Sequence, residues 1–581
     1  MSNQSEKKKQ NLFIQLIRLL WIGSVLVNIK SIFADFDYDA SYAMAMSYRN
    51  LMGDRMFLEM REPHQTSAFF LRILESVFIG ITGKTAYLAL FLQFSGVLIY
   101  ALATFILFRF LRKYTTCEAA HFASILFFTF RPKYLVLMEF SNMQILFSVF
   151  LFLFLMEALF EHKKRNLVLS AIFLCLEILS YPACLLTFAV VLVILLIYAK
   201  NRLKDSLLFS AVCLTCGIIY IGYFASRLGF SGLLSVPKML STGDSYHGSA
   251  LLSLSGYLKE FLIGLAWLSV SAASAFLLAR IMQLIKQRKN PNTDTNRSFF
   301  CIDSYVFFSV YGILLVIGDT VLLFLTANGG RYAVWMFGCS MLFPLMILTG
   351  FRCLSACDNK ERILFISGVL ISTSSFFAVM LLTNLSLISI VGYLILGGMI
   401  SMIPICRYLK SKKEQHILLF PILLCLTIIL HRGIAIRDYA QGSATILGIR
   451  NIVRSGPCAG ITCGYLAYYQ NKCDYPLWCE QIKENDSLLI ITHWTVDSSL
   501  YLYSPSSVSH YSTISTPTYD ESLLQYWSEY PEKYPTILAV ECWFGTSYLD
   551  PNSAIAQWID DHYEVCAQGS YWWFYRPKTK P

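Results

Sequence analysis

Long apolar runs separated by short polar turns make up most of residues 1–431. The first run is Leu12–Phe33, and later examples are Ala86–Phe108, Met143–Phe160 and Ile363–Leu382. A helix needs about 20 consecutive apolar residues to cross a hydrocarbon core that is roughly 30 Å thick. Counted on that basis, the pattern predicts about thirteen transmembrane helices. We therefore expect residues 1–431 to form an α-helical polytopic membrane domain.

A polar stretch interrupts this pattern directly after the first apolar run. It opens with Asp35, Asp37 and Asp39, and a second polar group, Arg61–Gln65, follows in the same loop. Ionisable groups beside hydrocarbon are costly and are retained mostly for function or for topology. We therefore predict that the first outer loop, residues 34–85, is the catalytic part of the membrane domain. The alternative is an ordinary hydrated loop.

Residues 432–581 have the composition of a water-soluble domain and the length of one compact unit. Two short apolar runs, Ser487–Thr492 and Thr536–Glu541, are typical of buried strands, and Tyr571–Tyr575 is typical of a closing strand. With helices or turns between them, these strands predict a small α/β domain. Its sequence contains no glycine-rich phosphate loop and no HExxH, GxSxG or dinucleotide-binding motif, so we assign it no catalysis.

The charged residues indicate which side of the membrane each turn faces. Only 14% of the residues are charged, and the formal net charge is +10. Lys and Arg lie in short clusters between the apolar runs, where they mark cytoplasmic turns and do not indicate a nucleic-acid partner. The basic leader MSNQSEKKKQ precedes the first run, which has no small-residue cleavage site after it. We predict a multi-pass plasma-membrane protein with a cytoplasmic N-terminus and, because the number of spans is odd, an extracytoplasmic C-terminal domain.

The chain has 17 cysteines, and no set of Cys and His shows the spacing of a zinc site. Four of them, Cys458, Cys463, Cys473 and Cys479, lie close together in the domain that is predicted to be outside. Thiols pair in an oxidising compartment. We therefore predict at least one disulfide among these four residues.

The order of these features resembles that of integral-membrane glycosyltransferases of the GT-C type, such as protein O-mannosyltransferases and lipid A aminoarabinose transferases. The features are an Asp-rich first loop, about a dozen spans with basic inside turns, a late outer turn Gly330-Arg331-Tyr332 and a C-terminal soluble domain. The family often has an Asp-Glu or Asp-Asp pair in the first loop, where this chain has Asp37-Tyr38-Asp39. Glu139, near the outer start of the fourth span, is similar to a second acidic residue of the family.

The resemblance covers most of the membrane part. It implies transfer of a sugar from a polyprenyl-phosphate carrier in the bilayer to a surface glycan, lipid or protein outside the cytoplasm.

The same residues suit the chemistry of such a transfer. A carboxylate is needed to take the acceptor's proton or to hold a divalent cation such as Mg or Mn, and a cation is needed to bind the departing lipid phosphate. Asp39 is the first candidate for the carboxylate and Asp37 is the reserve; both are candidate metal ligands, and Glu139 is a candidate partner.

Arg331 is the first candidate for the phosphate, because its guanidinium offers a fixed fork of donors. The other candidates for substrate binding are Tyr332, His64, Arg131 and Lys133. Structural roles stay open for several of them: Arg331 as a snorkelling or capping residue, His64 as a hydrogen-bonding loop residue and Glu139 as an ion-pair partner of Lys133.

Two other functions stay open. A transporter or flippase of lipid-linked or small polar substrates usually keeps polar groups or broken helices near the bilayer midplane. Few charges lie within the apolar runs here, and Glu177 and Asp319 are the exceptions. A non-catalytic component of cell-envelope assembly would use the C-terminal domain as its working part. Release of a lipid phosphate from a polyprenyl-phosphate sugar distinguishes the glycosyltransferase from both. The sequence leaves open the donor sugar, the acceptor and any dependence on metal.

Overall fold

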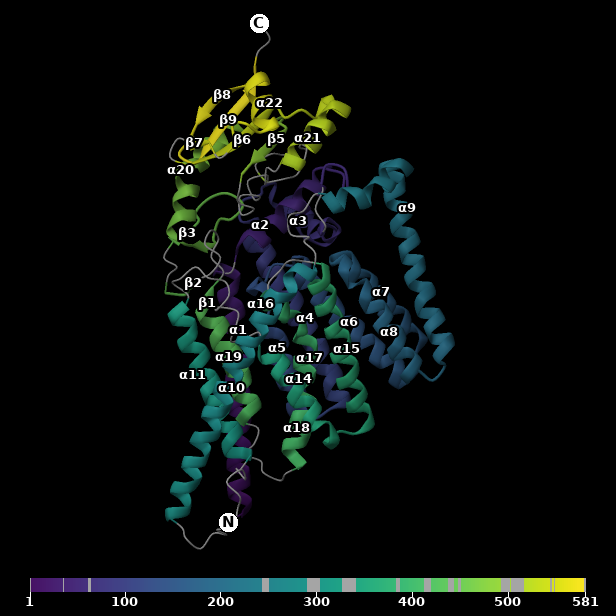
Figure 1. Ribbon diagram of the computed structural model, residues 1–581, viewed down its shortest axis with the longest axis vertical. Helices are drawn as coiled ribbons and strands as arrows, with labels where there is room; N and C mark the ends of the chain where they lie inside the picture. Colours follow the sequence, from purple (N-terminus) through teal and green to yellow (C-terminus); the bar gives the residue numbers. More distant parts are fainter. Residues whose placement is uncertain are drawn as a thin grey trace.

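The structure, a computed structural model, is an elongated bundle of helices with a small sheet at one end (Figure 1). The sheet and the C-terminus lie at one end of the long axis, and the N-terminus lies at the other. Two helices of the loop that we predict to be the first outer loop, α2 (Tyr38–Leu51) and α3 (Ala68–Thr82), lie between the long helices and the sheet. We call this the loop end of the bundle. The structure describes all residues except 1, 35, 61–63, 243–249, 290–303, 327–340, 383–386, 412–418, 437–443, 448–450, 493–501, 503–516, 544–545, 548 and 579–581.

The described residues include seven helical segments that are long and apolar enough to cross a membrane. They lie within α1 (Ser2–Ala34), α4 (Leu88–Tyr114), α6 (Phe140–Glu161), α9 (Arg202–Thr242), α10 (Ala250–Lys289), α15 (Asn359–Leu382) and the consecutive η6 (Val391–Leu394), α17 (Ile395–Ile400) and α18 (Met402–Ser411). The shorter apolar helices lie in α5 (Cys117–Thr129), η3 (Pro182–Cys184) with α8 (Leu185–Tyr198), α11 (Ser304–Thr326), α14 (Leu342–Cys353) with η5 (Leu354–Ala356), and α19 (Leu419–Ile434). The other helices of the membrane part are η1 (Gln65–Ser67), η2 (Pro132–Tyr134), α7 (Lys164–Ser180) and α16 (Leu387–Ile390). The predicted helical, multi-pass architecture is confirmed, while the count of about thirteen spans stays a prediction.

The helices differ in how much of their apolar surface faces other helices. The most apolar stretch of α9 is 11% buried, whereas that of α6 is 67% buried and that of the η6 to α18 segment is 89% buried. Large apolar side chains such as Leu207 and Ile219 on α9 and Val270 on α10 are exposed, as is expected of a surface that faces lipid. The segments that begin at Phe140 and Val391 therefore form the centre of the bundle, and the candidate site lies at the start of both.

The first outer loop is held by buried charges. Arg49 Nε lies 2.9 Å from Asp54 Oδ2, and both side chains are completely buried. One turn later, Glu59 accepts hydrogen bonds from Arg55 within the loop and from the hydroxyl group of Tyr526, which belongs to the C-terminal domain. Buried charges are tolerated when they are paired in this way. The loop thus has a fixed conformation that also contacts the C-terminal sheet domain.

The C-terminal part contains a five-stranded mixed sheet with strand order β5-β6-β9-β8 and with β7 paired to β6. Its strands are β5 (Leu488–Ile491), β6 (Ile537–Trp543), β7 (Thr546–Ser547), β8 (Tyr563–Gln568) and β9 (Trp572–Pro577). Strands β5 and β6 are parallel, with Leu488 opposite Ile537, and the other pairs are antiparallel. The three strands predicted from the sequence are confirmed. Short two-stranded pairs precede the sheet: β1 (Ala435–Ile436) with β2 (Ala444–Thr445), and β3 (Asn451–Ile452) with β4 (Thr462–Cys463).

Helices cover both faces of this sheet, which is why β5 is apolar and buried at all of its positions. On one face Leu488 and Ile490 share a core with Trp478 of α20 (Tyr465–Gln481). On the other face the neighbouring residues of β5 pack with α21 (Pro517–Glu529) and α22 (Ala554–His562), and a short η9 (Pro531–Lys533) follows α21. Leu58 of the first outer loop packs against this second core. The sheet domain and the first loop therefore share apolar contacts as well as hydrogen bonds.

The predicted disulfide is wrong for this structure. No disulfide joins Cys458, Cys463, Cys473 or Cys479 in the described part of the chain. Cys473 and Cys479 belong to the same helix, α20, and six residues of helix rise by about 9 Å, which places their Cα atoms farther apart than a disulfide can bridge. These two cysteines are therefore close in sequence but not in space.

Candidate functional site

Glu139 begins α6 at the loop end of the bundle. Its carboxylate accepts hydrogen bonds from the backbone N–H groups of Ser141 and Asn142, both at 2.8 Å. The first N–H groups of a helix have no partner within the helix, and the positive end of the helix dipole favours an acidic group. The side chain of Glu139 is completely buried. Glu139 is therefore a fixed acidic group at the start of the most central long helix.

Asp37 and Asp39 lie at the start of α2. The carboxylate of Asp37 is buried and accepts a hydrogen bond from the backbone N–H of Asp39 at 3.1 Å, which makes Asp37 the N-cap of the helix. The Oδ2 atom of Asp39 lies 3.0 Å from the Nζ atom of Lys133. The side chains of Asp39 and Lys133 are 26% and 9% exposed, so this ion pair is open to a substrate, whereas Asp37 is not.

Lys133 reaches Asp39 from a strained turn between α5 and α6. Lys133 and Tyr134 have φ angles of 53° and 63°, in the left-handed region that favours glycine. A non-glycine residue in that region costs roughly 1–3 kcal/mol and persists only where the surrounding structure imposes it. The ammonium group of Lys133 also lies 4.3 Å from the centre of the Phe140 ring, a cation–π contact. Two contacts therefore fix the position of the Lys133 side chain.

A buried chain of hydrogen bonds holds the strained turn from behind. The hydroxyl group of Tyr134 lies 2.6 Å from Nε2 of His431, and Nδ1 of His431 lies 2.8 Å from Oδ2 of Asp319 on α11. The carbonyl group of Tyr134 accepts a hydrogen bond from the guanidinium of Arg432 at 2.9 Å. All of these side chains are buried. They offset the backbone strain and keep the neighbouring Lys133 directed towards α2.

Aromatic rings line the other side of the site. The ring of His64 stacks on Phe140 with 4.2 Å between centroids and an angle of 12°, and it lies 4.5 Å from the ring of Tyr181. The hydroxyl group of Tyr393 donates to Ser141 Oγ at 2.9 Å, and its ring lies 6.1 Å from that of Tyr181. Ligand sites are commonly lined by aromatic side chains with a few fixed polar groups among them. The arrangement therefore suits a ligand with both apolar and charged faces.

Sequence analysis missed the aromatic part of the site. Tyr181 was visible as the residue before Pro182, where two apolar runs meet, but nothing in the local pattern marked it as a site residue. Phe140 and Tyr393 lie in apolar segments and look like ordinary packing residues. Only the proximity of these rings to His64 and Glu139 distinguishes them.

The other predicted site residues have different positions. Arg131 is buried, with its guanidinium 3.5 Å from the centre of the Tyr100 ring, and it donates hydrogen bonds to the backbone carbonyls of Phe127 and Phe130. It therefore lies within the packing between helices and not beside Asp39. Arg331 and Tyr332 fall outside the described residues, so their predicted role in phosphate binding stays a prediction. The structure thus brings together Asp39, Lys133, Glu139 and His64.

Burial and nearby charges shift the pKa of Glu139. Desolvation is the main cause and raises this pKa from its ordinary value of 4.5 to about 7. The charge of Lys133 and the hydrogen bonds from Ser141 and Asn142 lower it, and the charge of Asp39 raises it. Lys133 thus acts electrostatically on Glu139, although its ion pair is with Asp39. The three side chains form one coupled group of charges.

We expect the stability of the protein to fall between about pH 4.5 and pH 7 because of Glu139. A carboxyl group with a raised pKa holds its proton more tightly in the folded than in the unfolded chain. Glu139 therefore contributes its full share to the free energy of unfolding below about pH 4.5. This contribution is lost as the pH rises through about 7. Glu139→Gln removes the titration, so thermal unfolding in detergent should depend less on pH in this variant than in the wild type. An unchanged pH profile would contradict a raised pKa at Glu139.

The described residues of the site do not fit a resident divalent cation. Such an ion needs several oxygen ligands that converge on one position. Both oxygens of Glu139 accept backbone hydrogen bonds, and Asp37 is used as a helix cap. Among the described residues, no group of three or more His, Cys, Asp or Glu is placed to hold a metal ion. Beside Asp39, the ammonium group of Lys133 occupies the position that a cation would take.

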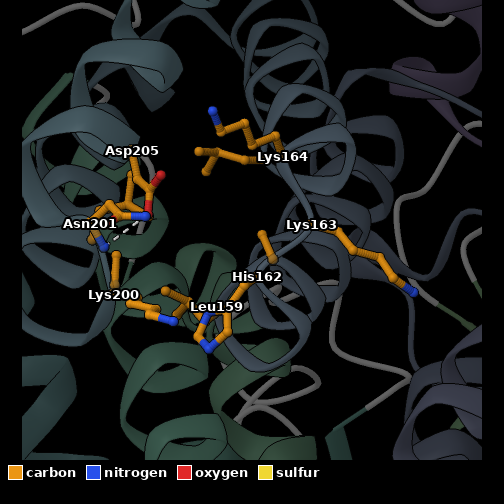
Figure 2. A pocket seen from close by; sticks show the side chains of 11 residues that line it. Leu159, His162, Lys163, Lys164, Lys200, Asn201 and Asp205 are labelled. Carbon is orange, nitrogen blue, oxygen red and sulfur yellow. Dashed lines mark hydrogen bonds between the residues drawn. The ribbon is translucent and has the colours of Figure 1, made fainter.

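A small basic cavity lies far from this site (Figure 2). It has a volume of about 40 Å³ and lies where the end of α6 meets the start of α7 and of α9. His162, Lys163, Lys164 and Lys200 contribute to its lining, together with Asp205. Helix α6 has 22 residues, which corresponds to about 33 Å, so the cavity and Glu139 lie at opposite ends of this helix. Its basic residues are those predicted to mark cytoplasmic turns.

No protein-family model matches the chain, and no curated protein matches its sequence. The fold is similar to that of the archaeal oligosaccharyltransferase AglB from Archaeoglobus fulgidus in complex with an inhibitory peptide and a dolichol-phosphate. The identity is 14%, the alignment covers 91% of this chain and 69% of that chain, and the TM-score is 0.43. A structure of the Archaeoglobus fulgidus oligosaccharyltransferase in complex with Zn and sulfate gives 13% identity, 90% and 67% coverage, and a TM-score of 0.44.

The chain is also similar to ArnT from Cupriavidus metallidurans bound to undecaprenyl phosphate, with 11% identity and a TM-score of 0.38. That alignment covers 97% of this chain and 98% of ArnT. Both neighbours are GT-C glycosyltransferases, the type of protein that the sequence resembles. Their TM-scores below 0.5 carry no argument about the function of this chain. At identities this low the likeness concerns the fold alone, and a function has to be argued from the residues of the site.

Proposed function

We propose that this protein transfers a sugar from a polyprenyl-phosphate donor to an acceptor at the loop end of the bundle. The observation that carries the proposal is the accessible Asp39–Lys133 pair at 3.0 Å, beside the buried Glu139 and the aromatic rings of His64 and Tyr181. The pair offers a proton acceptor and a cation within one small site. Sugar transfer from a lipid phosphate needs both of these groups.

Asp39 and Lys133 have complementary roles in the proposed reaction. The acceptor's hydroxyl oxygen forms a bond to the anomeric carbon of the sugar, while the bond from that carbon to the phosphate oxygen breaks. The carboxylate of Asp39 takes the proton of the hydroxyl group, and the electron pair of the broken bond leaves with the polyprenyl phosphate. The ammonium group of Lys133 donates hydrogen bonds to the departing phosphate, whose charge increases as the bond breaks.

The remaining residues fix the geometry of this site. Glu139 stays at the start of α6 and sets the electrostatic environment of Lys133. The rings of His64, Tyr181 and Tyr393 offer flat surfaces against which the sugar packs, as in many binding pockets. The long tail of the donor would lie in the bilayer, along the exposed apolar side chains of the bundle.

The proposed orientation places the N-terminus in the cytoplasm and residues 432–581 outside. The basic clusters of the sequence support this orientation. In Figure 1 the C-terminal sheet lies at the loop end and the N-terminus at the opposite end, which agrees with it. The donor and the acceptor would then meet on the outer face of the membrane, beneath the C-terminal domain.

A transporter is the weaker alternative, because the acidic residues within the helices bond to neighbouring helices. Glu177 of α7 accepts a hydrogen bond from Ser375 of α15 at 3.1 Å, and Asp319 contacts His431. Both acids are buried and serve in helix packing. Transporters instead place such groups around a substrate site near the midplane.

Turnover of a defined donor tests the proposal. We expect the purified protein to release polyprenyl phosphate from a panel of synthetic polyprenyl-phosphate sugars, detected by mass spectrometry. Lys133→Arg keeps the charge but replaces a compact ammonium with a planar group in a tight turn, so we expect the rate to fall about tenfold. Lys163→Arg, at the opposite end of α6, is the matched control and should keep the wild-type rate. The absence of release from every donor by the folded protein would refute the proposed function.

A further inference from the structure

A second basic cavity lies at the loop end, away from the Asp39–Lys133 pair. It has a volume of about 120 Å³ and lies between the end of α2, the first turn of α3 and the far part of α9. Its lining includes Asn50, Arg55, Arg72, Tyr223 and Arg227. A water molecule fills about 30 Å³ of liquid, so the cavity has room for a group larger than one water.

The acidic residues that the structure describes near this cavity, Asp54 and Glu59, are already neutralised. Asp54, which also lines it, is paired with Arg49, and Glu59 is paired with Arg55. Arg72 donates to the side-chain oxygen of Asn50 at 3.0 Å, and this contact brings no negative charge. The cavity therefore contains positive charge in excess, which calls for an anionic ligand.

Arg227 supplies the second unneutralised guanidinium. It lies 5.8 Å from the centre of the Tyr223 ring on the same helix, and the ring contact leaves its charge in place. In the described part of the chain, neither Arg227 nor Arg72 forms an ion pair with an acidic side chain. Arginine is the side chain best suited to phosphate, because its planar fork donates two parallel hydrogen bonds.

The surroundings of the cavity indicate a lipid. Ile73 and Val77 follow Arg72 on α3, Phe230 follows Arg227 on α9, and all three side chains are exposed. These exposed apolar side chains lie on the same helices as the two arginines, so a phosphate with an attached hydrocarbon chain would find partners for both of its parts on α3 and α9. The basic residues lie at the end of the bundle that we propose to face outwards, where topology does not require Lys or Arg.

This ligand differs from the phosphate of the sugar donor. Asp39 and Asn50 lie at opposite ends of α2, 11 residues apart, which corresponds to about 16 Å along the helix. The phosphate that leaves during sugar transfer has to lie within bonding distance of the sugar beside Asp39. A phosphate at Arg72 is too far away for that reaction.

We propose that Arg72 and Arg227 bind the phosphate of a bilayer phospholipid in this cavity. The lipid would join α9 to the first outer loop from the membrane side. In Figure 1 α9 stands at the flank of the bundle and bends towards α3 at its far end. The bend lies at Gly229, which has a φ angle of 71°, two residues beyond Arg227. Phe224 of α9 already contacts Phe57 of the loop, with 4.8 Å between ring centroids. The phosphate would add a polar contact between the same helix and the same loop.

Lipid binding measured by native mass spectrometry tests this site without any turnover. The probe is phosphatidylglycerol added to the delipidated, detergent-purified full chain. We expect Arg72→Gln with Arg227→Gln to weaken binding of the first phosphatidylglycerol at least about tenfold, in line with the loss of charge-assisted hydrogen bonds. Lys84→Gln, an exposed basic residue just beyond α3, is the matched control and should bind like the wild type.

Three outcomes would overturn the proposal. Equal phosphatidylglycerol binding by the double variant and the wild type would remove the arginines from lipid binding. An equal loss in Lys84→Gln would indicate general attraction between charges. Competition by inorganic phosphate at concentrations similar to those of the lipid would show that the site takes a soluble anion. None of these results depends on whether the protein transfers sugar, so the site and the proposed function fail or succeed separately.

Discussion

We expect Asp39→Asn to lower the rate of sugar transfer by about a hundredfold or more, because the accessible carboxylate paired with Lys133 loses its ability to accept a proton. Asparagine has nearly the same shape as aspartate, so the loss reflects chemistry and not packing. The measurement is the release of polyprenyl phosphate from the preferred donor under single-turnover conditions. Thermal stability should stay near that of the wild type, because the Asp39 side chain is partly exposed.

Asp37→Asn tests which of the two acidic residues at the start of α2 acts as the base. Asparagine caps a helix about as well as aspartate, and Asp37 is buried, so we expect this substitution to reduce the rate far less. A larger loss in Asp37→Asn than in Asp39→Asn would transfer the role of the base to Asp37. Near-normal transfer by both variants would remove the first outer loop from the mechanism.

Asp54→Asn should destabilise the protein by about 3 kcal/mol or more, because it removes the carboxylate that lies 2.9 Å from the buried guanidinium of Arg49. Neither side chain of this pair has any exposure to solvent. We expect a clear drop in the unfolding temperature of the detergent-solubilised protein. Because Arg55 and Glu59 follow directly, the contact between the first loop and Tyr526 of the C-terminal domain should loosen as well.

The surface pair of Lys410 and Glu118 provides the matched control. These side chains are 43% and 20% exposed, so Glu118→Gln should change the free energy of unfolding by less than about 1 kcal/mol. Arg49→Met combined with Asp54→Leu removes both buried charges and should recover much of the stability that Asp54→Asn loses. Equal stability of Asp54→Asn and Glu118→Gln would show that the buried pair does not hold the loop.

The sequence identified half of the candidate site. It marked Asp39 and Glu139 because acidic residues next to long apolar runs are conspicuous. It did not pair Asp39 with Lys133, because these residues lie 94 positions apart and meet only through a turn with left-handed backbone at Lys133 and Tyr134. It also placed Arg131 in the site together with Lys133. The guanidinium of Arg131 instead bonds to the backbone of α5, whereas the ammonium group of Lys133 pairs with Asp39.

The sequence by itself determined the helical multi-pass architecture and the three main strands of the C-terminal sheet, because the length of an apolar run and its local alternation decide these features. Only the tertiary structure decided which side chains meet. Tyr134 is held by His431, 297 positions later, and Glu59 of the first loop by Tyr526 of the C-terminal domain, 467 positions later. Such contacts depend on how the helices pack and not on any local pattern. For this reason the aromatic rings beside Glu139, the lack of a disulfide between Cys473 and Cys479, and the arginine cavity at α9 were not predicted from the sequence.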